Sequence, residues 1–82
     1  MSVTVYSKDN CPFCVQAKNL LKMRGVEYTE VRVDLDPAAR EFILSEGHKS
    51  VPQIYKDGKL IVEGGYMGLA KQMPEFFETL KG

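Results

Sequence analysis

The two cysteines of this chain, Cys11 and Cys14, are separated by only two residues. They follow an alternating apolar run that predicts a strand over residues 2–6, and they open a run with helical spacing over residues 12–24. A Cys-x-x-Cys pair at a strand-to-helix junction is typical of a thiol–disulfide redox site. The pair therefore indicates where the chemistry of this chain is carried out.

The predicted first helix places the two cysteines differently. Pro12 suits the first helical position, where a backbone N–H has no partner within the helix, and Gly25 ends the helix. Its inward stripe comprises Cys14, Ala17, Leu20 and Leu21. We therefore expect Cys14 against the core and Cys11 at the mouth of the helix.

The middle of the chain predicts a second strand and a second helix. Residues 27–35 alternate between an apolar face and a polar face, as in a strand. One face carries Val31, Val33 and Leu35, and the other carries Glu30, Arg32 and Asp34. Asp36 is an expected N-cap before Pro37. The second helix buries Ala39, Phe42 and Ile43 and ends at Gly47.

The C-terminal part predicts a hairpin and a last helix. Strands over residues 53–56 and 60–63 flank Asp57-Gly58, which is a two-residue hairpin signal. The last helix has an apolar stripe of Leu69, Met73, Phe76, Phe77 and Leu80, all expected in the core. Pro74 lies inside this stripe, so we expect a kink or a restart of the helix there. Because the stripe keeps its phase across Pro74, it favours a kink.

The predicted order is therefore βαβ, helix, β-hairpin, helix, in a single domain over residues 1–82. The βαβ crossover should be right-handed with parallel strands, and the hairpin adds an antiparallel pair. The expected fold is α/β and thioredoxin-like, with a four-stranded mixed sheet and helices on both of its faces.

The charge and apolar patterns exclude some classes of function. Lys plus Arg and Asp plus Glu both number 11, so the formal net charge is zero. This balance argues against binding to nucleic acid or a membrane surface through bulk charge. No apolar run approaches the roughly 20 residues that span a bilayer, and the N-terminus lacks a secretory pattern. We expect a cytoplasmic monomer. In an intracellular chain a cysteine pair is more often catalytic or metal-binding than structural.

Three motifs make the chain resemble the dithiol glutaredoxins over nearly its whole length. They are Tyr6-Ser7-Lys8 before Cys11-Pro12-Phe13-Cys14, then Ser50-Val51-Pro52-Gln53-Ile54, then Gly64-Gly65-Tyr66. The family usually has tyrosine in place of Phe13 and threonine in place of Ser50. It usually has aspartate at one or both of the positions of Met67 and Gly68, where it holds the amino group of glutathione. That carboxylate is absent here.

The resemblance implies a glutathione-dependent thiol–disulfide oxidoreductase that reduces protein disulfides and glutathionylated thiols. At a helix N-terminus, with Lys8 nearby, the Cys11 thiol should have a lowered pKa. Cys11 is therefore the expected nucleophile, and the more shielded Cys14 is the expected resolving cysteine. A disulfide between them would form and break as the chain carries out electron transport and maintains cell redox homeostasis.

The resemblance also implies a glutathione site. A cis Val51–Pro52 bond should turn the backbone polar groups of Val51 toward the tripeptide. Gly64 and Gly65 allow close backbone approach before the last helix, whose N-terminus can receive a carboxylate. The expected glutathione-binding residues are Lys8, Phe13, Ser50, Val51, Pro52, Gly65, Tyr66 and Met67.

Glutathione is the expected reductant, with no bound cofactor. A closed zinc site needs four ligands, and His48 is the only candidate ligand besides the two cysteines, so no metal site is expected. We expect His48 itself to be a solvated loop residue. Expected partners are the glutathione reductase system and disulfide-containing clients, for which the family suggests ribonucleotide reductase. Because Met67 and Gly68 replace the aspartates, a redoxin reduced by thioredoxin reductase is the first alternative. A glutathione-bridged iron–sulfur cluster carrier, using Cys11 in a dimer, is an alternative of another class.

Overall fold

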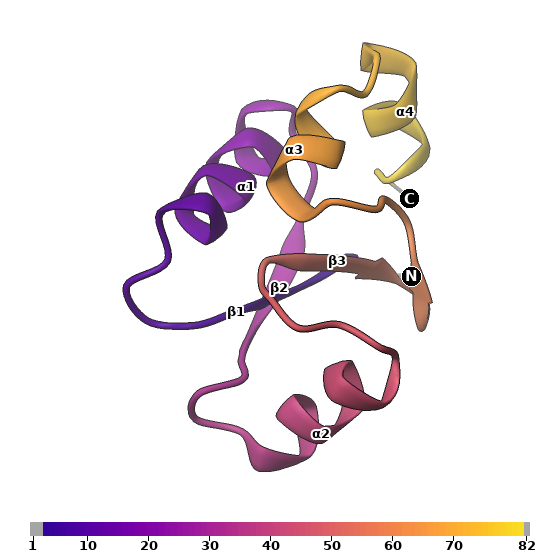
Figure 1. Ribbon diagram of the computed structural model, residues 1–82. Coiled ribbons are helices and arrows are strands. Elements are labelled where there is room, and N and C mark those ends of the chain that lie inside the picture. Colours follow the sequence, from indigo (N-terminus) through magenta and orange to yellow (C-terminus); the bar gives the residue numbers. More distant parts are fainter. Residues whose placement is uncertain (1–2, 82) are drawn as a thin grey trace.

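The computed structural model describes residues 3–81 and contains one mixed sheet (Figure 1). The elements are β1 (Val3–Ser7), α1 (Pro12–Met23), β2 (Tyr28–Arg32), α2 (Pro37–Ser45), β3 (Gln53–Lys56), β4 (Lys59–Leu60), α3 (Gly65–Ala70) and α4 (Pro74–Thr79). The strand order is β2-β1-β3-β4. β1 and β2 are parallel, whereas β3 is antiparallel to both β1 and β4. The predicted four-stranded mixed sheet is confirmed, although Ser2, expected to begin the first strand, lies outside the described residues.

Helices cover both faces of the sheet, as predicted. In Figure 1, α1, α3 and α4 lie on one face and α2 lies on the other. The larger core is on the three-helix face and comprises Val3, Val5, Ala17, Leu21, Val26, Ile54, Val62, Leu69, Phe77 and Leu80. On the α2 face, the Tyr6 ring contacts those of Phe42 and Tyr55, with centroids 5.6 and 5.4 Å apart. None of the helices within residues 3–81 combines the length and apolar character needed to cross a membrane.

Local capping explains where the first two helices begin. Cys11 and Asp36 are both extended N-cap residues, and each is followed by a proline at the first helical position. The Asp36 carboxylate accepts a hydrogen bond from the backbone N–H of Ala39 over 3.1 Å. Both predicted helix starts are therefore confirmed.

Two strands are shorter than the alternation predicts. β2 ends at Arg32, because the backbone N–H groups of Leu35 and Asp36 both donate to the Arg32 carbonyl in a turn. Leu35 is 72% exposed as a result, so the prediction that the strand continues to residue 35 is wrong. The return strand of the hairpin comprises only Lys59–Leu60, followed by one more backbone hydrogen bond to β3, from the Ile61 N–H to the Ile54 carbonyl over 3.1 Å. Apolar alternation does not reveal the turn after β2, because backbone hydrogen bonds close it.

Of the two outcomes expected at Pro74, the restart is confirmed and the favoured kink is wrong. α3 ends at Ala70 and α4 begins at Pro74, so the chain restarts its helix. Met73 is extended (φ −76°, ψ 160°), because a proline disfavours helical geometry in the residue before it. Its side chain is 68% exposed, which corrects its assignment to the core, whereas Phe77 is buried as expected.

Candidate active site

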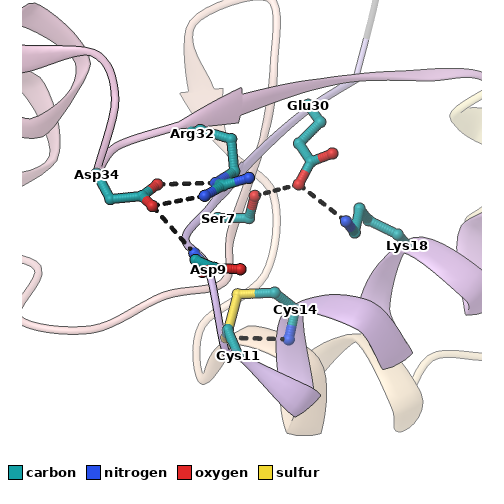
Figure 2. A network of polar contacts seen from close by, with 8 residues as sticks. All are labelled: Ser7, Asp9, Cys11, Cys14, Lys18, Glu30, Arg32 and Asp34. Carbon is teal, nitrogen blue, oxygen red and sulfur yellow. Dashed lines mark hydrogen bonds and ion pairs between the residues drawn. A yellow bond between two sulfur atoms is a disulfide. The ribbon is translucent and has the colours of Figure 1, made fainter.

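The Cys11–Cys14 pair forms a disulfide at the N-terminus of α1 (Figure 2). Their Cα atoms are 5.2 Å apart. The backbone N–H of Cys14 donates to the Sγ of Cys11 over 3.2 Å. In the reduced protein, this N–H group and the positive end of the helix dipole would both favour a thiolate on Cys11.

The two cysteines differ in exposure in the predicted order. Cys11 is 9% exposed and Cys14 is 1% exposed. The N-cap position keeps Cys11 at the helix mouth, while Cys14, one turn further along, points into the domain. An attacking role therefore suits Cys11, and a resolving role suits Cys14.

The loop before β3 lies directly against the disulfide. The Val51–Pro52 peptide bond is cis, as the resemblance implied, and the Val51 carbonyl oxygen is 3.8 Å from the Sγ of Cys11. The Gln53 side chain donates to the Ser50 carbonyl over 2.8 Å, which fixes the loop to the sheet. A Cβ at Gly65 would lie 2.7 Å from the Pro52 carbonyl oxygen, so the close approach expected of the double glycine occurs here.

A groove of about 570 Å³ runs beside this loop, between residues 47–53 and residues 63–67. The ring of Phe13 stacks on that of Tyr66, with centroids 6.1 Å apart, and closes one side of the groove. Phe13 and Met67 are 53% and 59% exposed, so an apolar rim faces solvent. The groove is lined by Phe13, Ser50, Val51, Pro52, Gly65, Tyr66 and Met67, which are the expected glutathione-binding residues other than Lys8.

Lys8 lies on the other side of the same loop. It lines a second groove together with Ser50 and Val51, and a third groove together with Cys11 and Cys14. The structure thus places Lys8 beside the cysteines and outside the groove that holds the other expected binding residues.

Gly68 has a structural reason to lack a side chain. A Cβ at this position would overlap the carbonyl oxygen of Glu63, which belongs to the segment that leads into α3. An aspartate at position 68 would require this backbone to take another course. Met67, by contrast, is exposed and lines the groove, so it does not cover the core.

A polar network near the disulfide was missed by the sequence analysis (Figure 2). Glu30 accepts hydrogen bonds from the Ser7 hydroxyl and from the Lys18 ammonium, the latter over 2.8 Å. These bonds, with that from Lys18 the stronger, lower the pKa of the Glu30 carboxyl. Parallel pairing sets Glu30 beside Val5, on the face that α1 covers, where its side chain is 32% exposed and meets Lys18. The available signal was Lys18, four residues after Cys14 on the same helix face.

A second ion pair holds the loop that leads to Cys11. The Arg32 guanidinium bonds both carboxylate oxygens of Asp34, over 2.8 and 2.6 Å. Asp34 also accepts from the backbone N–H of Asp9 over 3.3 Å. The Arg32 hydrogen bonds are the main reason that the pKa of the Asp34 carboxyl falls to about 2.

His48 is not the solvated loop residue that the sequence suggested. Its Nε2 is 2.8 Å from the hydroxyl of Tyr55, and the two rings meet edge to face. The Tyr55 hydroxyl also donates to Glu46 over 3.1 Å. Burial, followed by the Glu46 contact, raises the pKa of Tyr55 to about 12. His48 therefore anchors the start of the loop to β3. Within residues 3–81, no three His, Cys, Asp or Glu side chains converge as a ligand set for a metal.

Comparison with known families adds to this geometry. The family model described as Glutaredoxin matches residues 3–61. This chain belongs to the glutaredoxin family. It is accordingly a thiol oxidoreductase of that family with a Cys11–Cys14 pair.

Individual relatives include a glutaredoxin and a glutaredoxin-like protein. Glutaredoxin 3 of Escherichia coli (strain K12) is 41% identical over 61 residues, which cover 73% of this chain and 74% of the relative. The glutaredoxin-like protein NrdH of Salmonella typhimurium is 35% identical over 54 residues, covering 66% and 67%. A crystal structure of a buckwheat glutaredoxin–glutathione complex matches with a TM-score of 0.77 at 25% identity, covering 96% and 74%.

Proposed function

We propose that this protein is a glutathione-dependent thiol–disulfide oxidoreductase that reduces protein disulfides and glutathionylated thiols. The main support is the groove beside Cys11, which gathers seven of the expected binding residues next to the Val51 carbonyl. An extended cysteinyl peptide has backbone groups that pair with those of an exposed strand-like loop. Glutathione fits such a groove because it is a short peptide with its thiol at the centre.

The proposed chemistry begins with a thiolate on Cys11. It attacks one sulfur of the substrate disulfide, a new S–S bond forms to Cys11, and the other substrate sulfur leaves as a thiolate. Cys14 then attacks Cys11, releases the second substrate thiol and produces the disulfide seen in this structure. Two glutathione molecules restore the dithiol and leave as glutathione disulfide. Glutathionylated thiols require only Cys11, because a second glutathione can resolve the mixed disulfide.

A second candidate is the same reaction with thioredoxin reductase as electron donor. Gly68 leaves no room for the carboxylate that usually holds glutathione, and Met67 and Phe13 give the groove an apolar rim. A relative named glutaredoxin-like protein NrdH is consistent with this branch. Because six other expected binding residues besides Met67 line the groove, we place glutathione first.

The deciding experiment is a coupled NADPH-oxidation assay with each donor system. One arm contains glutathione and glutathione reductase, and the other contains thioredoxin reductase alone. We expect turnover of a glutathionylated peptide in the first arm. Cys11→Ser should abolish this activity, while Cys14→Ser should retain it, because only Cys11 bonds to the substrate. Rapid turnover with thioredoxin reductase and none with glutathione would reverse the order of the two candidates.

We also propose that the protein acts in the cytoplasm on disulfide-containing clients, such as ribonucleotide reductase. This proposal is supported by the single cysteine pair with redox-type spacing. Trapping clients on a Cys14→Ser variant from a cytoplasmic extract would test it. Recovery of no mixed disulfides that depend on Cys11 would contradict it.

A further inference from the structure

We propose that Glu30 is a positioning residue for the dithiol: it holds the Lys18 ammonium in a neutral pair beside Cys14 and thereby sets the reduction potential of the Cys11–Cys14 disulfide. The inference goes beyond the proposed function, since it concerns the cysteines themselves and applies to either electron donor.

The ion pair lies in the same groove as the sulfur atoms. Lys18 follows Cys14 by one turn of α1, so both side chains leave the same helix face. Both members of the ion pair line a groove of about 420 Å³ together with Cys11 and Cys14. The Lys18 and Glu30 side chains are only 22% and 32% exposed. Water therefore screens their charges less than it would on an open surface.

Glu30 is held in place by a buried hydroxyl. Ser7 is 0% exposed and donates to the same carboxylate oxygen that receives the Lys18 ammonium. A buried hydroxyl needs a hydrogen-bond partner, so this contact fixes the direction of the Glu30 carboxylate. Ser7 is the last residue of β1, directly before the loop that leads to Cys11. The pair is thus tied to the framework of the active site.

The other charges at this groove do not replace Lys18. The groove is also lined by Lys8, Asp9 and Arg32. Arg32 is held by Asp34 over 2.6 Å, and Asp9 and Lys8 both precede Cys11 in the loop. Lys18 is the cation on the helix face of Cys14, and Glu30 is the anion that neutralises it.

Reduction changes the charge at the two sulfurs. Two electrons break the S–S bond; at neutral pH Cys14 takes up a proton, and Cys11 is left as a thiolate. In the test below, the electrons come from a thiol reductant, which is oxidised to its disulfide. The reduced form therefore carries a negative charge that the oxidised form lacks. A net positive charge beside the sulfurs favours reduction, and a net negative charge opposes it.

The test compares Glu30→Gln, Lys18→Met and the double variant. Each protein is equilibrated with mixtures of reduced and oxidised glutathione, used as a chemical redox buffer, and its free thiols are counted after alkylation. We expect Glu30→Gln to raise the equilibrium constant for reduction about threefold and Lys18→Met to lower it about threefold, the size typical of partly exposed pairs. Threefold corresponds to a shift of about 14 mV, at 29.6 mV per tenfold. The double variant should return close to the wild type.

Opposite signs separate this role from a purely structural one. Loss of a structural contact would lower the thermal midpoint of both single variants without moving their potentials in opposite directions. Shifts of the same sign, or none, would overturn the proposal. Matched controls are Glu78→Gln and Lys81→Met, which break a pair of the same 2.8 Å length that lines none of the three grooves.

The proposal stays testable if one variant fails to fold, and its test does not depend on the donor assay. If Glu30→Gln does not fold, the Lys18→Met potential must still lie below that of the wild type at low salt and approach it at high salt. The equilibrium contains no reductase, so failure of the donor assay would leave this result standing. Conversely, turnover of the glutathionylated peptide together with unchanged reduction potentials in all variants would contradict the role of Glu30 and leave the proposed function standing.

Discussion

At the scale of single residues, two glycines decide how closely two segments of the active-site region approach. Gly65 has a positive φ of 58°, and a Cβ there would lie 2.7 Å from the Pro52 carbonyl oxygen. Gly68 packs even more closely on the Glu63 carbonyl. The first contact brings the start of α3 to the cis-proline loop, and the second excludes a side chain at position 68. Both contacts shape the groove beside the disulfide.

Gly65→Ala is expected to destabilise the protein more than Gly47→Ala does. Both glycines have positive φ, but a Cβ at Gly47 would meet no atom within 4 Å. The control, Gly47→Ala, should lower the free energy of unfolding by roughly 1–2 kcal/mol, because alanine is strained in the left-handed backbone conformation. Gly65→Ala should lower the free energy of unfolding by about 1–3 kcal/mol more than the control does, because Pro52 must move to make room for the Cβ. Urea unfolding with an unchanged m-value measures both free energies. Equal losses would show that the approach to Pro52 is not tight.

At the scale of elements, a charged contact ties the turn after β2 to the loop before α1. Asp34 accepts two bonds from Arg32 and one from the backbone of Asp9. The Arg32 bonds lower the pKa of the Asp34 carboxyl to about 2, from its ordinary value of 3.8. The folded state therefore prefers the ionised carboxylate.

This contact predicts a stability difference between wild type and Asp34→Asn that depends on pH. Because the folded pKa is below the unfolded one, the stabilisation is complete above pH 3.8 and disappears as the pH falls through about 2. Thermal midpoints of both proteins between pH 7 and pH 2 provide the measurement. Both proteins retain Glu30, so its titration cancels in the difference. A gap that persists at pH 2 would contradict the assigned cause.

At the scale of the whole molecule, a small core on the three-helix face holds the site together. The core joins β1 and β3 to α1, α3 and α4. Phe77 is 2% exposed in α4, and the Arg24 guanidinium lies 5.3 Å from its ring centroid. Phe13 is 53% exposed at the groove and contributes little to this core. Phe77 therefore packs in the core, whereas Phe13 lines the groove.

We expect Phe77→Ala and Phe13→Ala to have very different effects on stability. Removal of the buried Phe77 ring should lower the free energy of unfolding by about 3–5 kcal/mol. This loss lowers the thermal midpoint by more than about 10 °C in a domain of this size. Removal of the exposed Phe13 ring should lower the free energy of unfolding by less than about 1 kcal/mol. Thermal unfolding of both variants, oxidised in the same way, gives the comparison. If Phe13→Ala lowered the free energy of unfolding as much as Phe77→Ala, the Phe13 ring would be shown to stabilise the fold.

The sequence determined the features that depend on neighbouring residues. A proline after each N-cap located the starts of α1 and α2, and Asp57-Gly58 located the hairpin. Periodicity identified Cys14 and Leu21 as the buried face of α1. These features were predictable because each is encoded by capping, turn or spacing chemistry within a few residues. The mixed sheet and its helical layers followed from their order along the chain.

Only the tertiary structure decided which distant segments meet. The parallel register of β1 and β2 sets Glu30 beside Val5, where it accepts a hydrogen bond from Lys18 of α1, a contact that alternation alone did not predict. The course of the chain after β4 placed the Glu63 carbonyl against Gly68, and the extended Met73 separated α3 from α4. Local patterns could not supply these contacts, because a register between strands and the path of a loop depend on the packing of residues far apart in sequence.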